Sequence, residues 1–346
     1  MSTDELAKLR KELEEIDKAI VELIAKRFEL SKRIGEVKQR LELHILDVIR
    51  EAEVLMYWRA LATKYSLPVD AVVEVVNTLL KISRYAQAKL VKPVEVSVNS
   101  ICIVGYGGMA KLLAKAFANE GYKVFITGRD LEKAHATAEE VGVGFGKAEE
   151  SLFKSSAILL ALPPQAFWNG YVDSIATLMR GKLVMDILSS KARLFKHIEQ
   201  LSERHGFKYV SAHPLFGPYT PPYGERVVLI PSRTGLDVLS LAEGLWRSIG
   251  VETTVSTLEE HEKAMAVIQV VTHFMLLSYR DFVKEMAKEL EVDLNRFATA
   301  TFRDVQSIIQ RLEKIESVVK EIASENPYSQ QIKNRFLEHI TKQLAK

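Results

Sequence analysis

His213 stands in the stretch VSAHPLFGPY, just past an apolar run and before a loop rich in proline and glycine. A neutral imidazole at such a position can accept a hydroxyl proton at about pH 7. Ser189 and Lys191, in MDILSSK, follow a second apolar run and could orient that imidazole or a substrate hydroxyl. Arg303, in TATFRDVQS, offers a bidentate partner for a carboxylate. A lone histidine is more often structural, but this one is predicted at the carboxyl edge of a parallel sheet, where ligands bind.

A glycine-rich turn, GYGGMA, follows the apolar run ICIV and precedes an amphipathic helical pattern. Gly105, Gly107 and Ala110 form G-x-G-x-x-A in the strand–turn–helix setting that dinucleotide binding requires. The first glycine permits the tight turn, the second lets a pyrophosphate approach the backbone, and the helix N-terminus supplies amide donors. We therefore predict a dinucleotide site that also includes Gly108 and Met109. The alternative is a tight turn in an α/β domain that has lost its ligand.

The next strand ends in FITGRD, at the place where an NAD site usually carries Asp or Glu. Thr127 or Gly128 occupies that acidic position, and Arg129 follows. Glycine leaves room and arginine offers a fork for a 2′-phosphate, so the pattern favours NADP over NAD. Asp130 is either a displaced acid or the N-cap of the next helix, and we favour the cap.

The elements that must position these residues fall into three parts, as expected for a chain of 346 residues. Residues 1–92 predict an all-α domain with a long first helix and further helices over 44–64 and 69–90. Helices this long cannot bury their apolar stripes alone, so we expect them to form a homodimer.

Residues 98–252 alternate near-continuous apolar strands with helices, including helices over 109–120 and 131–140. This pattern predicts an α/β Rossmann domain with a doubly wound parallel sheet, entered through a linker at 91–100. Residues 253–346 are again helical and predict a C-terminal all-α substrate and dimerisation domain.

Composition excludes several classes of function. The 47 basic and 45 acidic residues leave a net charge of +2, so nothing favours nucleic acid or an anionic membrane as a partner. Cys102 is the single cysteine, which excludes an internal disulfide framework, and its strand-like surroundings predict burial. The N-terminus is charged throughout, and no stretch approaches the ~18 apolar residues of a membrane span, so we expect a cytoplasmic protein.

Five motifs lie in order after residue 98: G-x-G-G-M, D-x-x-S-x-K, H-P-x-F-G-P, EEHEKAMAVIQVVTHF and F-R-D. Together they resemble prephenate dehydrogenase over about residues 98 to 320. The resemblance implies that His213 is the catalytic histidine that hydrogen-bonds the ring hydroxyl of prephenate. It implies that Ser189 supports this histidine and that Arg303 binds a carboxylate of the substrate.

The implied chemistry accounts for these residue types. Removal of the hydroxyl proton lets hydride leave the same ring carbon for the nicotinamide, and loss of the ring carboxylate as CO2 then aromatises the ring. No metal is needed. His261 and His273 match helix histidines near the substrate in this family. The sequence ILSSK lacks the glycine or alanine that many relatives place before the serine.

The spacing of charged residues in the first predicted helix indicates which of them can lie on one helical face. Arg27 and Lys38 are eleven residues apart and fall within about 20° of one helical face, so they can line one pocket. Arg10 points roughly 100° away and would more easily serve another site. The alternative is a set of solvated charges in ordinary helical pairs.

Polar residues of the next two helices repeat at helical spacing: Asp47, Arg50 and Glu51 on the second, Ser83 and Gln87 on the third. With L-R at 9–10 and AKRFELSKRIGEVK, they match in order and without gaps. This spacing resembles the all-helical chorismate mutase family over essentially the whole N-terminal domain.

The second resemblance implies a role for each residue. Arg10 of the partner chain and Arg27 hold the substrate carboxylates, and Lys38 and Gln87 donate to the ether oxygen as the C–O bond breaks. Because Gln87 is neutral, the site should not need acid to work. The remaining members complete the pocket: Asp47, Arg50, Glu51 and Ser83.

The two resemblances predict a bifunctional enzyme of tyrosine biosynthesis that converts chorismate to prephenate and prephenate to 4-hydroxyphenylpyruvate with NADP or NAD. Fusion to a mutase favours prephenate over arogenate. One alternative is an NADP-dependent dehydrogenase of another small hydroxy acid, whose helical N-terminal domain only dimerises. Another is a ligand-sensing regulatory protein without turnover.

Overall fold

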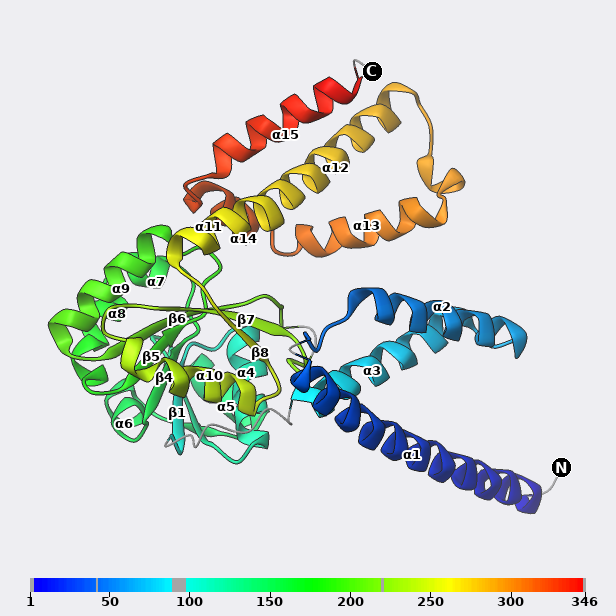
Figure 1. Ribbon diagram of the computed structural model, residues 1–346, viewed down its shortest axis with the longest axis horizontal. Helices are drawn as coiled ribbons and strands as arrows, with labels where there is room; N and C mark the ends of the chain where they lie inside the picture. Colours follow the sequence, from blue (N-terminus) through cyan, green and yellow to red (C-terminus); the bar gives the residue numbers. More distant parts are fainter. Residues whose placement is uncertain (1–2, 42, 89–97, 219–220, 345–346) are drawn as a thin grey trace.

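The structure is a computed structural model that describes residues 3–41, 43–88, 98–218 and 221–344. It contains an N-terminal group of helices, a central sheet domain and a C-terminal group of helices (Figure 1). The predicted linker at 91–100 lies largely outside the described residues, and the first strand begins at Ser100.

The N-terminal helices are α1 (Thr3–Arg40), α2 (Val48–Lys64) and α3 (Val69–Ala88). The second helix begins at Val48 rather than at residue 44, because Asp47 is its N-cap and accepts a hydrogen bond from the backbone N–H of Arg50 at 3.0 Å. Helix α1 packs on α3 near its C-terminal end, and its N-terminal half extends away from the other elements (Figure 1).

The central sheet has eight strands in the order β3-β2-β1-β4-β5-β6-β7-β8. The strands are β1 (Ser100–Val104), β2 (Lys123–Thr127), β3 (Gly144–Phe145), β4 (Ala157–Leu160), β5 (Leu183–Asp186), β6 (Lys208–Pro214), β7 (Arg226–Pro231) and β8 (Glu252–Val255). Strands β1 to β6 are mutually parallel, as the doubly wound pattern predicts.

Strand β7 departs from the prediction, since it pairs with β6 in antiparallel register. The described residues of the connection, 215–218 and 221–225, contain no crossover helix, and a parallel pair requires such a crossover. Strand β8 follows helix α10 (Leu239–Ser248) and pairs with β7 in parallel, so both strands run antiparallel to the first six.

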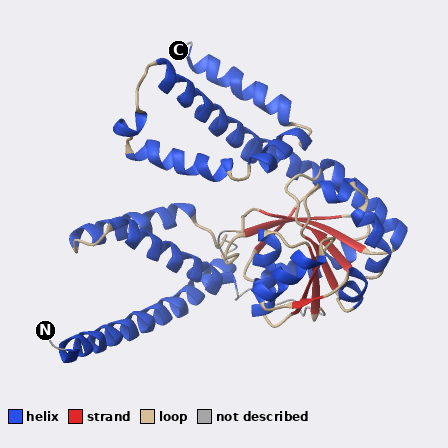
Figure 2. Ribbon diagram, turned by 180° about the vertical axis from the view of Figure 1, so that it is seen from behind, coloured by secondary structure: helices blue, strands red, loops and turns tan. Residues whose placement is uncertain are grey.

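Helices cover both faces of the sheet (Figure 2). Along β1, Ile101 and Ile103 join one apolar core with α4, α5 and α10, while Cys102 and Val104 join a second core with α6 to α9. Cys102 is fully buried, as predicted, and burial raises the pKa of its thiol to about 12. The helical segments of this domain are α4 (Gly108–Asn119), α5 (Leu131–Val141), α6 (Ala148–Phe153), α7 (Gln165–Trp168), α8 (Tyr171–Ile175), η1 (Ala176–Met179), α9 (Ala192–His205), η2 (Leu236–Val238) and α10 (Leu239–Ser248).

The chain after β8 is helical, as predicted. Its segments are α11 (Leu258–Met265), the π-helical turn η3 (Ala266–Val271), α12 (Thr272–Glu289), η4 (Leu294–Phe297), α13 (Ala300–Glu313), α14 (Glu316–Glu325) and α15 (Ser329–Leu344). The N-terminal and C-terminal helices project as two arms from the same side of the sheet domain (Figures 1 and 2). Among the described residues, no helix combines the length and apolar character needed to cross a membrane.

One face of the N-terminal part of α1 is exposed in the single chain. Its residues recur at three- and four-residue spacing and are each between 49% and 63% exposed: Leu6, Leu9, Leu13, Ile16, Ile20 and Leu23. A stripe of this length on one helix is typical of a surface that another chain covers.

Candidate active sites

The glycine turn joins β1 to α4 at the carboxyl edge of the sheet. Gly105 has a φ of +135°, and a Cβ there would lie 2.1 Å from the carbonyl oxygen of Ala161, so only glycine fits. Gly107 is the N-cap of α4, and a Cβ on it would meet nothing within 4 Å, which leaves the backbone open to a ligand. Ala110 is buried in the core beneath the turn. The turn therefore has the geometry that phosphate binding needs.

A pocket of about 920 Å³ lies over this turn and is also lined by residues after β4 and β5 and by α14. Tyr171 lines it, and its hydroxyl is buried without a hydrogen-bond partner among the described residues. Burial raises the pKa of Tyr171 to about 12, so the hydroxyl remains a donor. The N–H groups at the start of α4 and the hydroxyl of Tyr171 fit the phosphates and riboses of a nicotinamide dinucleotide.

The turn after β2 contains the residues expected to distinguish NADP from NAD. Arg129 and Met109 line the cofactor pocket. Asp130 caps α5, because its carboxylate accepts a hydrogen bond from the backbone N–H of Lys133 at 3.1 Å, and the predicted cap is thereby confirmed. A Cβ on Gly128 would lie 2.8 Å from the ring of Tyr106, which belongs to the glycine turn. The packing of this ring therefore leaves no space for a side chain at position 128.

His213 lies at the carboxyl end of β6 and is 1% exposed. Its Nδ1 lies 2.8 Å from Nε2 of His261 in α11. The other ring nitrogen of His261, its Nδ1, lies 3.3 Å from a carboxylate oxygen of Glu262, but the two groups do not have the geometry of a hydrogen bond. Burial holds the pKa of His213 well below its ordinary value of 6.5, and the charges of Lys191 and His261 lower it further. The imidazole is therefore neutral at about pH 7, as a proton acceptor must be.

A buried ion pair lies close to His213. Lys191 Nζ donates to Asp186 Oδ1 at 2.5 Å and to the backbone carbonyl of Ala212, which precedes His213, at 2.7 Å. The other carboxylate oxygen of Asp186 accepts from the hydroxyls of Tyr209 and Ser211 at 2.7 and 2.5 Å. Burial lowers the pKa of Lys191, and the negative charge of Asp186 opposes that shift. This network locks the carboxyl ends of β5 and β6 together, and those ends carry the predicted serine and histidine.

The remaining predicted dehydrogenase residues have different surroundings. Ser189 lines the cofactor pocket, on the loop after β5. His273, in α12, is half-buried, its Nδ1 has no hydrogen-bond partner among the described residues, and burial lowers its pKa. Arg303 lies exposed on α13, where its guanidinium donates to the carbonyl of Ala298 at 2.6 Å. The single chain thus does not bring Arg303 to the cofactor pocket, and its role as a carboxylate partner stays a prediction.

Between α1 and α3, Arg27 is held by two groups. Its Nη1 donates to the carbonyl of Leu79 at 2.8 Å and also to the hydroxyl of Ser83. Burial lowers the pKa of this guanidinium. Since Gln87 lies one turn after Ser83 on α3, the arginine and the amide share one side of the helical group.

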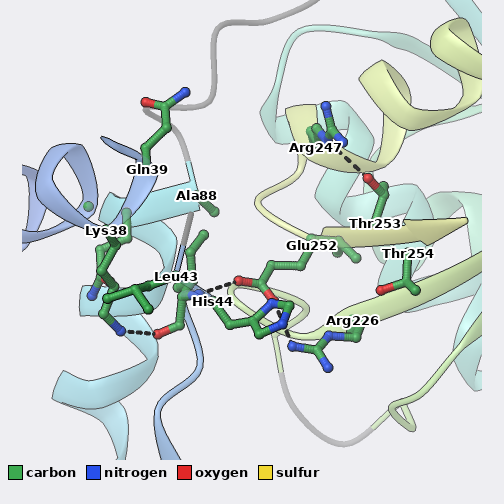
Figure 3. Close-up of a pocket in the computed structure, with 14 residues that line it drawn as sticks. Lys38, Gln39, Leu43, His44, Ala88, Arg226, Arg247, Glu252, Thr253 and Thr254 are labelled. Atoms are coloured by element: carbon green, nitrogen blue, oxygen red, sulfur yellow. Dashed lines mark hydrogen bonds and ion pairs between the residues drawn. The ribbon is translucent and has the colours of Figure 1, made fainter. Parts of the chain in front are cut away.

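A second pocket, of about 310 Å³, is lined by Lys38 (Figure 3). Gln87 also lines it. Lys38 Nζ donates to the backbone carbonyl of Ile45 at 2.7 Å. Gln87 is 9% exposed, and its Oε1 has no hydrogen-bond partner in the described part of the chain. The ammonium of Lys38 suits an anionic group on a ligand, and the unpartnered amide oxygen of Gln87 suits a hydrogen-bond donor on it.

The other predicted mutase residues do not face this pocket in the single chain. Arg50 is exposed and pairs with Glu53 at 2.8 Å. Glu51 pairs with Arg84 of α3 at 3.1 Å, and Asp47 is occupied as the cap of α2. Arg10 lies exposed on the half of α1 that extends away from the other elements, and its role in the site of another chain stays a prediction.

Sequence reasoning missed part of the buried network around His213. Tyr209 and Ser211 alternate with the histidine along β6, and this alternation of polar residues was a readable signal. Glu262 accepts from the backbone N–H of Lys191 at 3.1 Å and from the side-chain amide of Asn326 at 3.0 Å. No pattern in the sequence links Glu262 to Asn326, because only the folding of α14 onto α11 brings them together.

Three family models match successive parts of the chain. Chorismate mutase type II matches residues 9–88, the nucleotide-binding domain of prephenate dehydrogenase matches 113–255, and the dimerization domain of prephenate dehydrogenase matches 257–345.

Curated relatives divide in the same way. The chorismate mutase of Methanocaldococcus jannaschii is 30% identical over 84 residues, which are 24% of this chain and 85% of that protein. The T-protein of Enterobacter agglomerans is 26% identical over 277 residues, covering 80% of this chain and 70% of that protein. A protein of M. jannaschii named "Probable arogenate/prephenate dehydrogenase" is 29% identical over 65% of this chain, and the chain spans about half of its length (49%).

Solved structures share the fold of the sheet domain and C-terminal helices. Prephenate dehydrogenase from A. aeolicus, solved with hydroxyphenyl propionate and NAD+, has a TM-score of 0.58 at 21% identity and covers 72% of this chain and 90% of its own. The arogenate dehydrogenase of Synechocystis has a TM-score of 0.57 at 18% identity, over 71% of this chain and 89% of its own.

Proposed function

We propose that this chain, which belongs to the chorismate mutase type II and prephenate dehydrogenase families, catalyses both reactions in succession. Helices α1 to α3 rearrange chorismate to prephenate, and the rest of the chain oxidises and decarboxylates prephenate to 4-hydroxyphenylpyruvate. One observation carries the proposal: a single chain contains a pocket lined by Lys38 and Gln87 and a second pocket over the glycine turn that Ser189 lines. His213 does not line the second pocket but lies buried at the carboxyl end of β6, on the same edge of the sheet. A helical domain that only dimerised would have no use for the first pocket.

In the mutase site the protein supplies electrostatics and shape. The rearrangement is unimolecular, so it needs no nucleophile and gains from preorganised donors where charge develops. Lys38 and Gln87 would donate to the ether oxygen as negative charge builds on it. Arg27, fixed by Leu79 and Ser83, would hold a carboxylate.

In the dehydrogenase site the hydrogen bond between His213 and His261 determines which ring nitrogen of His213 can accept the substrate proton. When His213 carries its proton on Nδ1 and donates it to His261, its Nε2 remains a free acceptor for the substrate hydroxyl. The nearby carboxylate of Glu262 favours the tautomer of His261 that is protonated on Nδ1. A nicotinamide bound over the glycine turn would accept the hydride that leaves the same ring carbon.

The cofactor is a nicotinamide dinucleotide, and we propose NADP as the preferred form. Arg129 lines the pocket at the end of β2, where a ribose-binding carboxylate would stand in an NAD site. Asp130 does not replace that carboxylate, because it is occupied as the cap of α5. NAD remains the alternative, and a comparison of kcat/KM with NADP and with NAD in the variant Arg129→Ala separates the two.

A homodimer follows from the surfaces that a single chain leaves open. The apolar face of α1 defined above is exposed, and Arg10 lies on the same projecting half of the helix. We propose that a second copy covers this face and contributes its Arg10 to the mutase site. The near-balanced charge and the single buried cysteine suit a cytoplasmic enzyme.

The experiment that tests the proposal is a pair of substitutions with opposite effects. His213→Asn should reduce oxidation of prephenate by about 10²- to 10⁴-fold, the usual contribution of a general base, and should leave the decay of chorismate unchanged. Lys38→Ala should abolish the decay of chorismate and leave prephenate oxidation unchanged. If either substitution in a folded protein removed both activities, the proposed division between the domains would be wrong.

A further inference from the structure

The pocket that contains Lys38 and Gln87 has one wall made by the sheet domain. Arg226 at the start of β7, Arg247 in α10 and Glu252 at the start of β8 all line it (Figure 3). The helical group therefore does not enclose this pocket by itself.

A chain of hydrogen bonds runs from that wall to the ammonium of Lys38 (Figure 3). Arg226 Nη2 donates to Glu252 Oε2 at 3.1 Å, and Glu252 Oε1 accepts the backbone N–H of Ile45 at 2.8 Å. The carbonyl of Ile45 accepts from Lys38 Nζ at 2.7 Å. Ile45, whose carbonyl accepts from the ammonium, is thus held through its own N–H by a carboxylate 207 residues later in the chain.

Glu252 is itself rigidly placed against the helical group. Its side chain is 13% exposed, and its backbone N–H donates to the carbonyl of Glu225 at 2.8 Å. Nearby, Gly250 lies against the ring of Tyr85 in α3, since a Cβ on this glycine would come within 2.8 Å of the ring. Because α3 also carries Gln87, the wall and the helical side of the pocket form one packed unit.

An ammonium on a flexible four-carbon stem loses side-chain conformational entropy when it is fixed. The bond to Ile45 takes one of its three donors and leaves two for a ligand. A donor fixed before the reaction avoids reorganisation when charge develops on the substrate.

We infer that Glu252 is a positioning residue for the mutase reaction: through Ile45 it fixes Lys38, so the dehydrogenase part completes the mutase site. This inference rests on the proposed mutase activity. It predicts that loss of the carboxylate slows the chemical step of the mutase, because Lys38 then samples positions from which it cannot reach the ether oxygen.

Three variants of the full chain test it: Glu252→Ala, Glu252→Gln and Glu199→Ala. Glu252→Ala should lower the mutase kcat by about tenfold or more, the usual loss for a hydrogen bond to a charged group, with a smaller change in KM. Glu252→Gln keeps an oxygen that can accept from Ile45 and should recover most of that rate. Oxidation of prephenate supplied directly should be unchanged in all three.

Glu199→Ala is the matched control. Glu199 is 14% exposed, accepts a backbone N–H from Arg233 at 3.0 Å and pairs with its guanidinium, but lines neither pocket. A mutase kcat for Glu252→Ala within twofold of the parent would overturn the inference, as would an equal loss in the Gln variant or in both activities. Absence of chorismate turnover in the parent would instead overturn the proposed function.

Discussion

The protonation state of the His213 imidazole depends on the groups packed around it. Burial holds its pKa well below 6.5, and the positive charge of Lys191 contributes to the same shift. A base with a lowered pKa stays neutral to lower pH, so the oxidation rate should fall only well below pH 6.5, the ordinary value for histidine.

Removing the buried ion pair of Asp186 and Lys191 should change the pH below which the oxidation rate falls. The double variant Asp186→Asn, Lys191→Met removes both charges of this pair together, and the lysine no longer lowers the pKa of His213. The acid limb of kcat/KM for prephenate oxidation should therefore shift to higher pH. Measurement of this profile against the parent tests it, and an unmoved limb would show that Lys191 does not act on His213.

The preference for NADP should depend on Arg129. Arg129→Ala removes the fork proposed for the 2′-phosphate, and kcat/KM with NADP should fall by about tenfold or more, with little change for NAD. Arg233→Ala, at an exposed arginine outside both pockets, is the control. A ratio of the two cofactors that did not change in Arg129→Ala would rule out this assignment.

At the scale of elements, α3 approaches the sheet domain through two glycines. Gly224 has a φ of +69°, and a Cβ there would lie 2.0 Å from Cβ of Arg84. Gly250 plays the same part against Tyr85. The sheet domain can support the mutase pocket only because both positions lack a side chain.

Gly224→Ala should therefore destabilise the protein more than an ordinary glycine replacement. Gly121 is the matched control: it has a φ of +87° with nothing within 4 Å of a Cβ, so Gly121→Ala should cost only the ~1–2 kcal/mol of left-handed backbone. Gly224→Ala adds a steric clash, and its thermal midpoint in calorimetry should fall further. Equal midpoints would mean that α3 can move away freely.

Most elements were predictable because their signals are local. The periodicity of α1 and the strand–turn–helix pattern around Gly105 follow from neighbouring residues. The reversal of β7 was missed, since apolar strands in parallel and antiparallel pairs look alike in sequence. The asparagine at 326 and the glutamate at 252 were missed for another reason: their partners lie far away in the chain.

At the scale of the whole molecule, the proposed homodimer would cover apolar faces that the single chain leaves exposed. The exposed stripe of α1 and the half-exposed Met275, Tyr279 and Phe282 of α12 lie on different arms. A dimer that paired both arms would bury these faces and place Arg10 of one chain beside the mutase site of the other.

Subunit complementation tests this arrangement. Arg10→Ala and Lys38→Ala should each lack mutase activity, because each dimer loses one essential cation from both sites. After the two variants are mixed and their subunits exchange, half of the dimers are hybrids with one intact site of two. About a quarter of the parent activity should therefore return. No recovery in a mixture shown to contain hybrids would mean that Arg10 acts within its own chain.

The central claim is that one chain catalyses two successive steps, and one assay addresses it directly. The purified protein is mixed with chorismate and with NADP or NAD, and the chorismate band and reduced nicotinamide are followed together. We predict that chorismate decays without cofactor, and that reduced cofactor appears after a lag when cofactor is present, faster with NADP. Chorismate that persists, or decays without any reduction of either cofactor, would contradict the account.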